Sequence, residues 1–251
     1  DGYGYGPDGS AWGGEILHCT RKGEFQRLGH LEKQPMVGSD LATRYPLRMA
    51  AGILHGKTEV EDWLHVNCSH FPHGEEEVEV ILQQLGRPSV LKTTSCGRVL
   101  DAVSAILGVC YERTYEGEPA MKLESAALNG RDVLEPQPTT ASGNVIDTAS
   151  LVNEIFIQRN KFSVADLAFS AQSYIARSLA QLASEKAGRL GIDVVGFSGG
   201  VAYNEQMTAT IRRVVKEEKL RFVVHELVPP GDGGISFGQA MAAAWQMRAR
   251  E

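Results

Sequence analysis

Three glycine-rich turns hold the residues of this 251-residue chain that are best suited to chemistry. The first opens the sequence, where Gly2, Gly4 and Gly6 follow Asp1 at every second position. Glycines at that spacing let backbone N–H groups approach an anion that a Cβ atom would hold away. The turn could therefore hold a phosphate, and a flexible hairpin loop is the alternative.

The second turn, Ser198-Gly199-Gly200, follows an apolar run and precedes a helical pattern that begins near Asn204. A turn between a strand and a helix points unpaired amides and the positive end of the helix dipole at a ligand. The Asn204 side chain could add a hydrogen bond to a base or a ribose. The turn matches neither the dinucleotide-binding glycine fingerprint nor the P-loop, so an ordinary Gly-Gly turn is the alternative.

The third turn places Asp232 among Gly231, Gly233 and Gly234, directly before an Ala-rich helical pattern. A carboxylate there suits a hard or borderline cation, or a water molecule held near a phosphate. An aspartate in that position is also a common N-cap, and this turn by itself favours the cap.

Two other candidate sites carry weaker signals. Residues 65–73 contain three histidines and Cys68, but their spacing matches no common zinc module, and a surface loop explains them. The sequence contains neither a GxSxG elbow nor a Ser-His-Asp order, so we do not expect a hydrolase triad. We interpret His18 and His225, which lie on expected strands, as ordinary side chains.

The hydrophobic pattern predicts the elements that position these turns. A β-hairpin is expected from residues 15–19 and 24–28. Helices are expected over residues 39–54, 74–85, 94–110, 148–159 and 164–190. In the second of them Glu75, Glu76, Glu77 and Glu79 form a solvated face, and Thr94 or Ser95 caps the third.

The C-terminal part alternates strands and helices. Strands are expected over residues 192–197 and 221–225, and helices from about residue 204 and over 235–247. This order is typical of an α/β layer with ligand loops at the carboxyl ends of its strands. Residues 136–143 have the composition of a linker, which suggests a hairpin and helical part over 1–135 and an α/β lobe over 136–251.

Composition limits the classes of protein that need considering. With 43% hydrophobic residues the chain can bury a substantial core, and its net charge of −6 argues against a grip on nucleic acid. Four scattered cysteines suit reduced thiols in the cytoplasm, and no apolar run is long enough to cross a membrane. The chain opens at Asp1 on a glycine motif where a leading strand would be expected, so we expect it to be a fragment.

Taken together, the motifs resemble those of the hydrogenase maturation carbamoyltransferase family across essentially the whole chain. The runs that carry the resemblance are DGYGYGPDG (1–9), WGGE (12–15), PLRMA (46–50), TSCGRVLDAV (94–103), YEGEPAMKLE (115–124), SGGVAYN (198–204) and DGGISFGQA (232–240). Each run is weak by itself, but their order and spacing are hard to obtain by chance.

The resemblance implies an α/β fold of the actin-like ATPase (ribonuclease H-like) type, with the second lobe, part of the first, an N-terminal hairpin and a helical insertion. Full-length members resemble a series of an acylphosphatase, a zinc-finger-like segment, a domain that makes carbamoyl-adenylate and a terminal actin-like domain. This chain looks like the last. The implied activity is transfer of a carbamoyl group, derived from carbamoyl phosphate and activated with ATP, to the C-terminal cysteine of a partner maturation protein for cyanide ligand synthesis.

The resemblance also assigns residues to the nucleotide and to a metal. It places Asp101, Gly117 and Glu124 at the ribose, Asn204 at the base, and Ser198, Gly199 and Gly200 beneath the phosphates. Asp1 and Asp232 match two ligands of a divalent metal, which could be iron, zinc or magnesium. The two histidines of the HxxxH motif that completes the site in such relatives would lie upstream of residue 1, and two carboxylates alone are a poor site.

There are two rival interpretations, the first of the same fold and the second from a different functional class. One is an O-carbamoyltransferase that acts on a small molecule, and an acylphosphatase or zinc-finger module upstream would decide against it. The other is a nucleotide-binding fragment without catalysis, which would bind ATP and transfer nothing.

Overall fold

The computed structural model describes residues 4–20, 23–134 and 143–248. The strands are β1 (Gly4–Tyr5), β2 (Ala11–Trp12), β3 (Glu15–Cys19), β4 (Phe25–Leu31), β5 (Gln34–Pro35), β6 (Lys92–Thr93), β7 (Val145–Ile146), β8 (Val194–Gly196) and β9 (Arg221–Val223). The α-helices are α1 (Asp40–Arg44), α2 (Leu47–Leu54), α3 (Val60–Val66), α4 (Gly74–Leu85), α5 (Cys96–Ile106), α6 (Glu118–Ala126), α7 (Ala149–Gln158), α8 (Val164–Leu190), α9 (Glu205–Glu217) and α10 (Ile235–Arg248). Short 3-10 helices are η1 (Cys68–His70), η2 (Gly200–Tyr203) and η3 (Asp232–Gly234).

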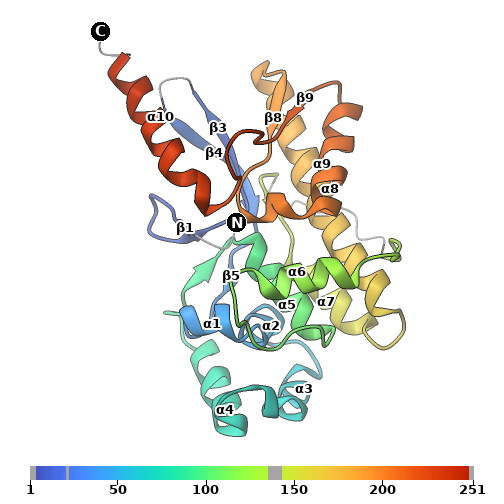
Figure 1. The fold of residues 1–251 in the computed structure, drawn as a ribbon. Coiled ribbons are helices and arrows are strands. Elements are labelled where there is room, and N and C mark those ends of the chain that lie inside the picture. The colour runs from blue at the N-terminus through green and yellow to red at the C-terminus, as the bar shows by residue number, and fades with distance from the viewer. Residues whose placement is uncertain (1–3, 21–22, 135–142, 249–251) are drawn as a thin grey trace.

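The helices α1 to α7 gather in one part of the molecule, and β3, β4, β8, β9 and α9 lie in the other (Figure 1). The helix α8 runs through both parts, and its 27 residues give it a length of about 40 Å. The Ser163 side chain caps its start by accepting a hydrogen bond from the Asp166 N–H at 3.1 Å, and Gly191, with a φ of 66°, ends it. The predicted helix over 164–190 is confirmed.

Three small sheets carry the strands. Their strand orders are β1-β2-β6-β5, β3-β4-β7 and β8-β9. The strands β3 and β4 pair antiparallel, with Cys19 opposite Phe25, which confirms the predicted hairpin. Its Arg21-Lys22 turn lies outside the described residues.

The parallel pair β8 and β9 brings two of the glycine turns together. Val194 lies opposite Arg221, so both strands end at the same edge. There the Gly199 N–H donates a hydrogen bond to the Pro230 carbonyl oxygen at 2.8 Å. The predicted order of strand, turn, helix, strand, turn and helix is confirmed.

The single helix expected from residue 39 to 54 is two helices, α1 and α2. Pro46 stands at the N-cap of α2, and because proline has no N–H to donate, the first helix cannot continue through it. The expected helix over 94–110 is the shorter α5, and the Ser95 hydroxyl caps it by accepting from the Arg98 N–H at 3.1 Å.

The prediction of a fully solvated acidic face on α4 is wrong at Glu77. This carboxylate is buried, and its Oε1 lies 2.5 Å from Nη2 of Arg48, which is buried on α2. Its Oε2 accepts a hydrogen bond from the His73 N–H at 3.1 Å. A buried charge is tolerated when it is paired and hydrogen-bonded, and this pair fastens α4 to α2.

One hydrophobic core includes residues from Leu31 to Val215. The division into parts over 1–135 and 136–251 stays a prediction, and most of the expected linker lies outside the described residues. Among the residues that the structure describes, no helix combines the length and the apolar character needed to cross a bilayer.

Candidate functional site

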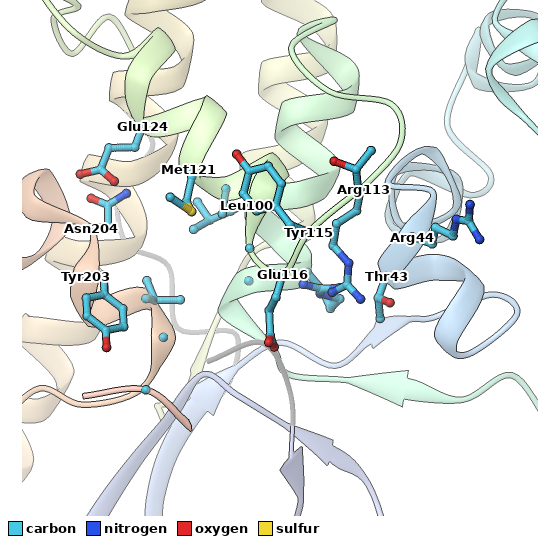
Figure 2. A pocket seen from close by; sticks show the side chains of 18 of the residues that line it. Thr43, Arg44, Leu100, Arg113, Tyr115, Glu116, Met121, Glu124, Tyr203 and Asn204 are labelled. Carbon is cyan, nitrogen blue, oxygen red and sulfur yellow. The ribbon is translucent and has the colours of Figure 1, made fainter. Parts of the chain in front are cut away.

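A cleft of about 1550 Å³ opens between the helical part and the turns that follow β8 and β9. Its walls come from α1, the first turns of α5, residues 112–117, α6, η2 and the turn that contains Asp232. In Figure 2, Asn204 and Glu124 lie together at one end, and Arg113 and Thr43 lie toward the other. The cleft brings together five of the residues that the sequence predicted as ligands: Gly117, Glu124, Gly200, Asn204 and Asp232.

Asn204 links the turn after β8 to two helices. Its Oδ1 accepts a hydrogen bond from the Met207 N–H at 2.8 Å and so caps α9. Its Nδ2 donates to Oε1 of the fully buried Gln172 at 2.6 Å. Gln172 in turn donates to the Ala168 carbonyl oxygen on α8 at 3.0 Å. Because an amide has two N–H donors and two acceptor lone pairs, Asn204 keeps hydrogen-bonding capacity for a ligand while α8 fixes its position.

Glu124 joins α6 to the start of α9. Its Oε1 accepts a hydrogen bond from the Glu205 N–H at 2.7 Å. At the other end of α6, Gly117 forms the N-cap with a φ of 75°, a conformation that favours glycine. Two of the three predicted ribose residues, Gly117 and Glu124, therefore stand at opposite ends of one helix that lines the cleft.

Glu118 fixes the segment that leads into α6. Its Oε2 accepts hydrogen bonds from the N–H and the hydroxyl of Thr114, at 2.6 and 2.8 Å. Hydrogen bonds from Lys122 and then from Thr114 lower the pKa of Glu118 to about 2. The carboxylate stays ionised at neutral pH and holds the cleft wall over residues 112–117 in place.

Asp101 does not line the cleft. It is fully buried one turn after Arg98, whose Nη2 lies 2.9 Å from its Oδ2. Burial raises the pKa of Asp101 to about 6, although the guanidinium groups of Arg98 and Arg113 act in the opposite direction. Arg98 itself lines the cleft, so it stands between Asp101 and any ligand there.

Ser198 and Gly199 lie beside the cleft without lining it. The Ser198 hydroxyl lies 2.8 Å from Nε2 of His225 and 3.3 Å from the Pro230 carbonyl oxygen. Ser198 and His225 instead border a second hollow of about 590 Å³ between β3, α8 and β8. Their contacts hold the turn after β8 against the turn that contains Asp232.

The turn with Asp232 packs closely on η2. A Cβ added to Gly231 would meet Cε2 of Tyr203 at 3.2 Å. Gly231 is the N-cap of η3, and Asp232 is the first residue of that helix and not its cap. Its place in the cleft wall leaves the Asp232 carboxylate available to a ligand.

The opening turn lies apart from the cleft in its described part. Asp1 and Gly2 lie outside the described residues. Gly4 pairs with Trp12 across β1 and β2, and neither Gly4 nor Gly6 lines the cleft. A Cβ on Gly6 would come within 2.3 Å of the Trp12 indole, so packing explains this glycine.

Sequence reasoning missed several residues of the cleft. They include a cationic pair, Arg98 and Arg113, and the side chains of Tyr115, Glu116, Met121 and Tyr203. Arg98 follows Gly97 in the same sequence run that identified Asp101 as a candidate, so the sequence did contain a signal for Arg98. Arg113 lies in a segment without periodicity, and no sequence signal identifies it.

The described residues do not supply a complete metal site. No group of three histidine, cysteine, aspartate or glutamate side chains within them could hold a metal ion. The histidines of 65–73 have other neighbours: His70 stacks on Tyr111 with ring centroids 3.7 Å apart, and His65 lies 3.4 Å from Glu75. Asp232 could contribute one ligand, and we derive no step through a metal.

Known proteins match this chain over nearly its whole length. A family model described as carbamoyltransferase, Kae1-like domain, second subdomain, matches residues 1–239. The chain belongs to this family. The match confirms the family and the actin-like fold class that the sequence motifs implied.

Three relatives show how much of this chain is similar to known proteins. The probable carbamoyltransferase HypF of Methanocaldococcus jannaschii is 41% identical over 244 residues, which cover 96% of this chain and 32% of that protein. The crystal structure of T. kodakarensis HypF matches with a TM-score of 0.90 and 40% identity, over 99% of this chain and 34% of that one. Full-length HypF in the phosphate- and nucleotide-bound form matches with a TM-score of 0.85 and 30% identity, over 97% of this chain and 32% of that one. The chain therefore spans about a third of the length of these relatives.

Proposed function

We propose that this chain is the nucleotide-binding part of a carbamoyltransferase that acts in nickel-iron hydrogenase maturation. One observation carries the proposal: Gly117, Glu124, Gly200, Asn204 and Asp232, which belong to separate segments of the chain, meet in one cleft. A cleft between packed elements with a few convergent polar groups is the usual form of a cofactor site. Because the chain spans about a third of its relatives, the activity belongs to the whole protein.

The ends of the cleft suit different parts of an adenylate. Asn204 and Glu124 offer hydrogen-bonding groups to a base and a ribose. Gly200 and the Asp232 turn lie at the starts of η2 and η3, where backbone amides favour phosphate oxygens. A direct bond between Asp101 and a ribose would require the Arg98 side chain to move aside, because Arg98 separates the two.

The proposed reaction transfers a carbamoyl group from carbamoyl-adenylate to the C-terminal cysteine of a partner maturation protein. The cysteine thiolate forms a bond to the carbamoyl carbon, the bond from that carbon to the phosphate oxygen breaks, and the electron pair leaves with AMP. Residues of this chain hold the phosphate in place while this exchange occurs. If a divalent metal takes part, Asp232 and Asp1 are the proposed ligands within this chain.

The test is a transfer assay on the full-length protein with ATP, labelled carbamoyl phosphate and a partner protein ending in cysteine. We expect Gly234→Ala to lower the transfer rate at least about tenfold, because its Cβ would lie 2.3 Å from the Pro229 carbonyl oxygen and must displace the Asp232 turn. Gly238→Ala is the matched control, since its Cβ meets no atom within 4 Å on α10. ATP binding without label transfer to the cysteine, or equal rates for the two variants, would contradict the proposal.

A further inference from the structure

Arg98 has donors that none of the described residues uses. The residue is 3% exposed, and its Nε and Nη1 are buried without a hydrogen-bond partner among the described residues. Its remaining nitrogen, Nη2, faces Asp101 at 2.9 Å. Buried polar groups in folded proteins are nearly always hydrogen-bonded, and both carboxylate oxygens of Asp101 also lack a hydrogen-bond partner among the described residues, so this buried pair is incompletely satisfied.

One side of Arg98 meets the cleft. Arg98 and Gly97 line the cleft from the first turn of α5, an 11-residue helix whose N-terminus carries a partial positive charge. Asp101 closes the other side of the guanidinium and is itself fully buried. The two nitrogens are themselves buried, so a ligand in the cleft would reach them once the guanidinium turns toward it.

A second cation strengthens this end of the cleft. Arg113 lines it, lies close enough to Asp101 to act on that carboxyl group, and points into the pocket in Figure 2. Arg98 and Arg113 outnumber Asp101, while Glu112 and Glu116 line the cleft from the same segment as Arg113.

We propose that Arg98 is a phosphate ligand, whose guanidinium turns toward the cleft and binds the oxyanion through its Nε and Nη1 with Arg113 beside it. The planar fork of a guanidinium matches two phosphate oxygens at once, which a lysine ammonium cannot do. Asp101 is then a positioning residue that orients this fork. The inference rests on the proposed function for the nucleotide that would carry the phosphate, and the phosphate site itself does not depend on it.

The experiment compares Arg98→Lys with the wild-type full-length protein by titration calorimetry with adenosine, AMP and inorganic phosphate. Lysine keeps a positive charge beside Asp101 but removes the two free donors. We expect the affinities for AMP and inorganic phosphate to fall about 10- to 100-fold while that for adenosine stays unchanged. Arg177→Lys, whose guanidinium pairs with Asp132 outside the cleft, is the matched control and should bind all three ligands as the wild type does.

The outcomes separate the possible sources of the phosphate. If Arg98→Lys loses affinity for inorganic phosphate alone, the site is supported with a free phosphate compound as its ligand. If it loses affinity for both AMP and inorganic phosphate, the ligand is a nucleotide phosphate. Unchanged binding in Arg98→Lys, or equal losses for adenosine and AMP, overturns the inference. If the wild type binds no adenosine or AMP, the proposed function fails, whereas inorganic phosphate still tests Arg98.

A second variant guards against misfolding. Arg98→Gln combined with Asp101→Asn removes both charges together, so no unpaired charge stays buried. We expect the same loss of phosphate affinity from this double variant, with the circular dichroism spectrum of the wild type. Retained phosphate binding in a folded double variant would overturn the inference as well.

Discussion

Replacing Arg98 with methionine should lower the free energy of unfolding by about 3 to 5 kcal/mol at pH 8, because the change leaves the Asp101 carboxylate buried without its partner. The loss should be smaller at pH 5. Burial already raises the pKa of Asp101 to about 6 in the presence of Arg98, and removal of the guanidinium raises it further.

The sign of the pH effect follows from proton linkage. An unfolded aspartate titrates near pH 4, so between about pH 4 and the higher folded pKa the folded state holds a proton that the unfolded state releases. The contribution of Asp101 to the free energy of unfolding therefore falls as the pH rises through that window. Below the folded pKa, Asp101 is mostly neutral in the folded state and needs no cation, which makes the loss at pH 5 smaller.

Urea denaturation at pH 5 and pH 8 measures the difference. Arg177→Met is the control, because its ion pair with Asp132 is partly exposed and should contribute at most about 1 kcal/mol. Equal losses for Arg98→Met at both pH values would show that Arg98 stabilises the fold through packing alone.

The second large effect is expected on nucleotide affinity in Asn204→Asp. Aspartate still caps α9, but it has no N–H to donate to Gln172 Oε1, which lies 2.6 Å from the present Nδ2. Rotating the Gln172 amide does not relieve the conflict, because its oxygen would then face the Ala168 carbonyl oxygen. The two facing oxygens repel each other and displace the side chain at 204 from its position in the cleft, so we expect ATP affinity to fall about tenfold or more.

The measurement is ATP titration with circular dichroism of the same sample. Gln206→Glu is the matched amide-to-acid control, since Gln206 is on α9, does not line the cleft and donates to the Phe169 carbonyl oxygen. If the Asn204→Asp variant keeps both its helix content and its ATP affinity, the proposed role of Gln172 in positioning Asn204 is contradicted.

The sequence predicted those parts of the fold that local signals determine. The helix α8 has a serine cap at Ser163 and a terminal glycine at Gly191, and both signals lie within its own segment. The two turns after β8 and β9 could be placed together because parallel strands end at a common edge. These signals predicted the neighbourhood of Gly200 and Asp232.

Other parts depend on contacts between distant residues and leave no local pattern. The strands β1, β2, β5, β6 and β7 have two residues each, and β2 pairs with β6 through Ala11 and Thr93. Nor does the run from Glu75 to Glu79 indicate that Glu77 alone turns inward, because the reason is Arg48 on another helix. Prediction from composition fails where a distant partner changes the environment of a charge.

The candidate site likewise contains residues that the sequence predicted and residues that it did not. Five cleft residues could be predicted because the motifs around them match those of the family. They are Gly117, Glu124, Gly200, Asn204 and Asp232, and all five line one cleft. Asp101 was named from its motif, but only the structure shows that Arg98 separates it from the cleft. Arg113 enters the site through the fold of a segment with no periodicity.

The most direct measurement of the central claim is a crystal structure of the full-length protein with bound AMP. We predict nucleotide density in the cleft between α6 and η2, with the base and ribose near Asn204 and Glu124 and the phosphate toward Arg98. AMP bound elsewhere, with this cleft free of nucleotide, would contradict the claim that these segments form an adenylate site.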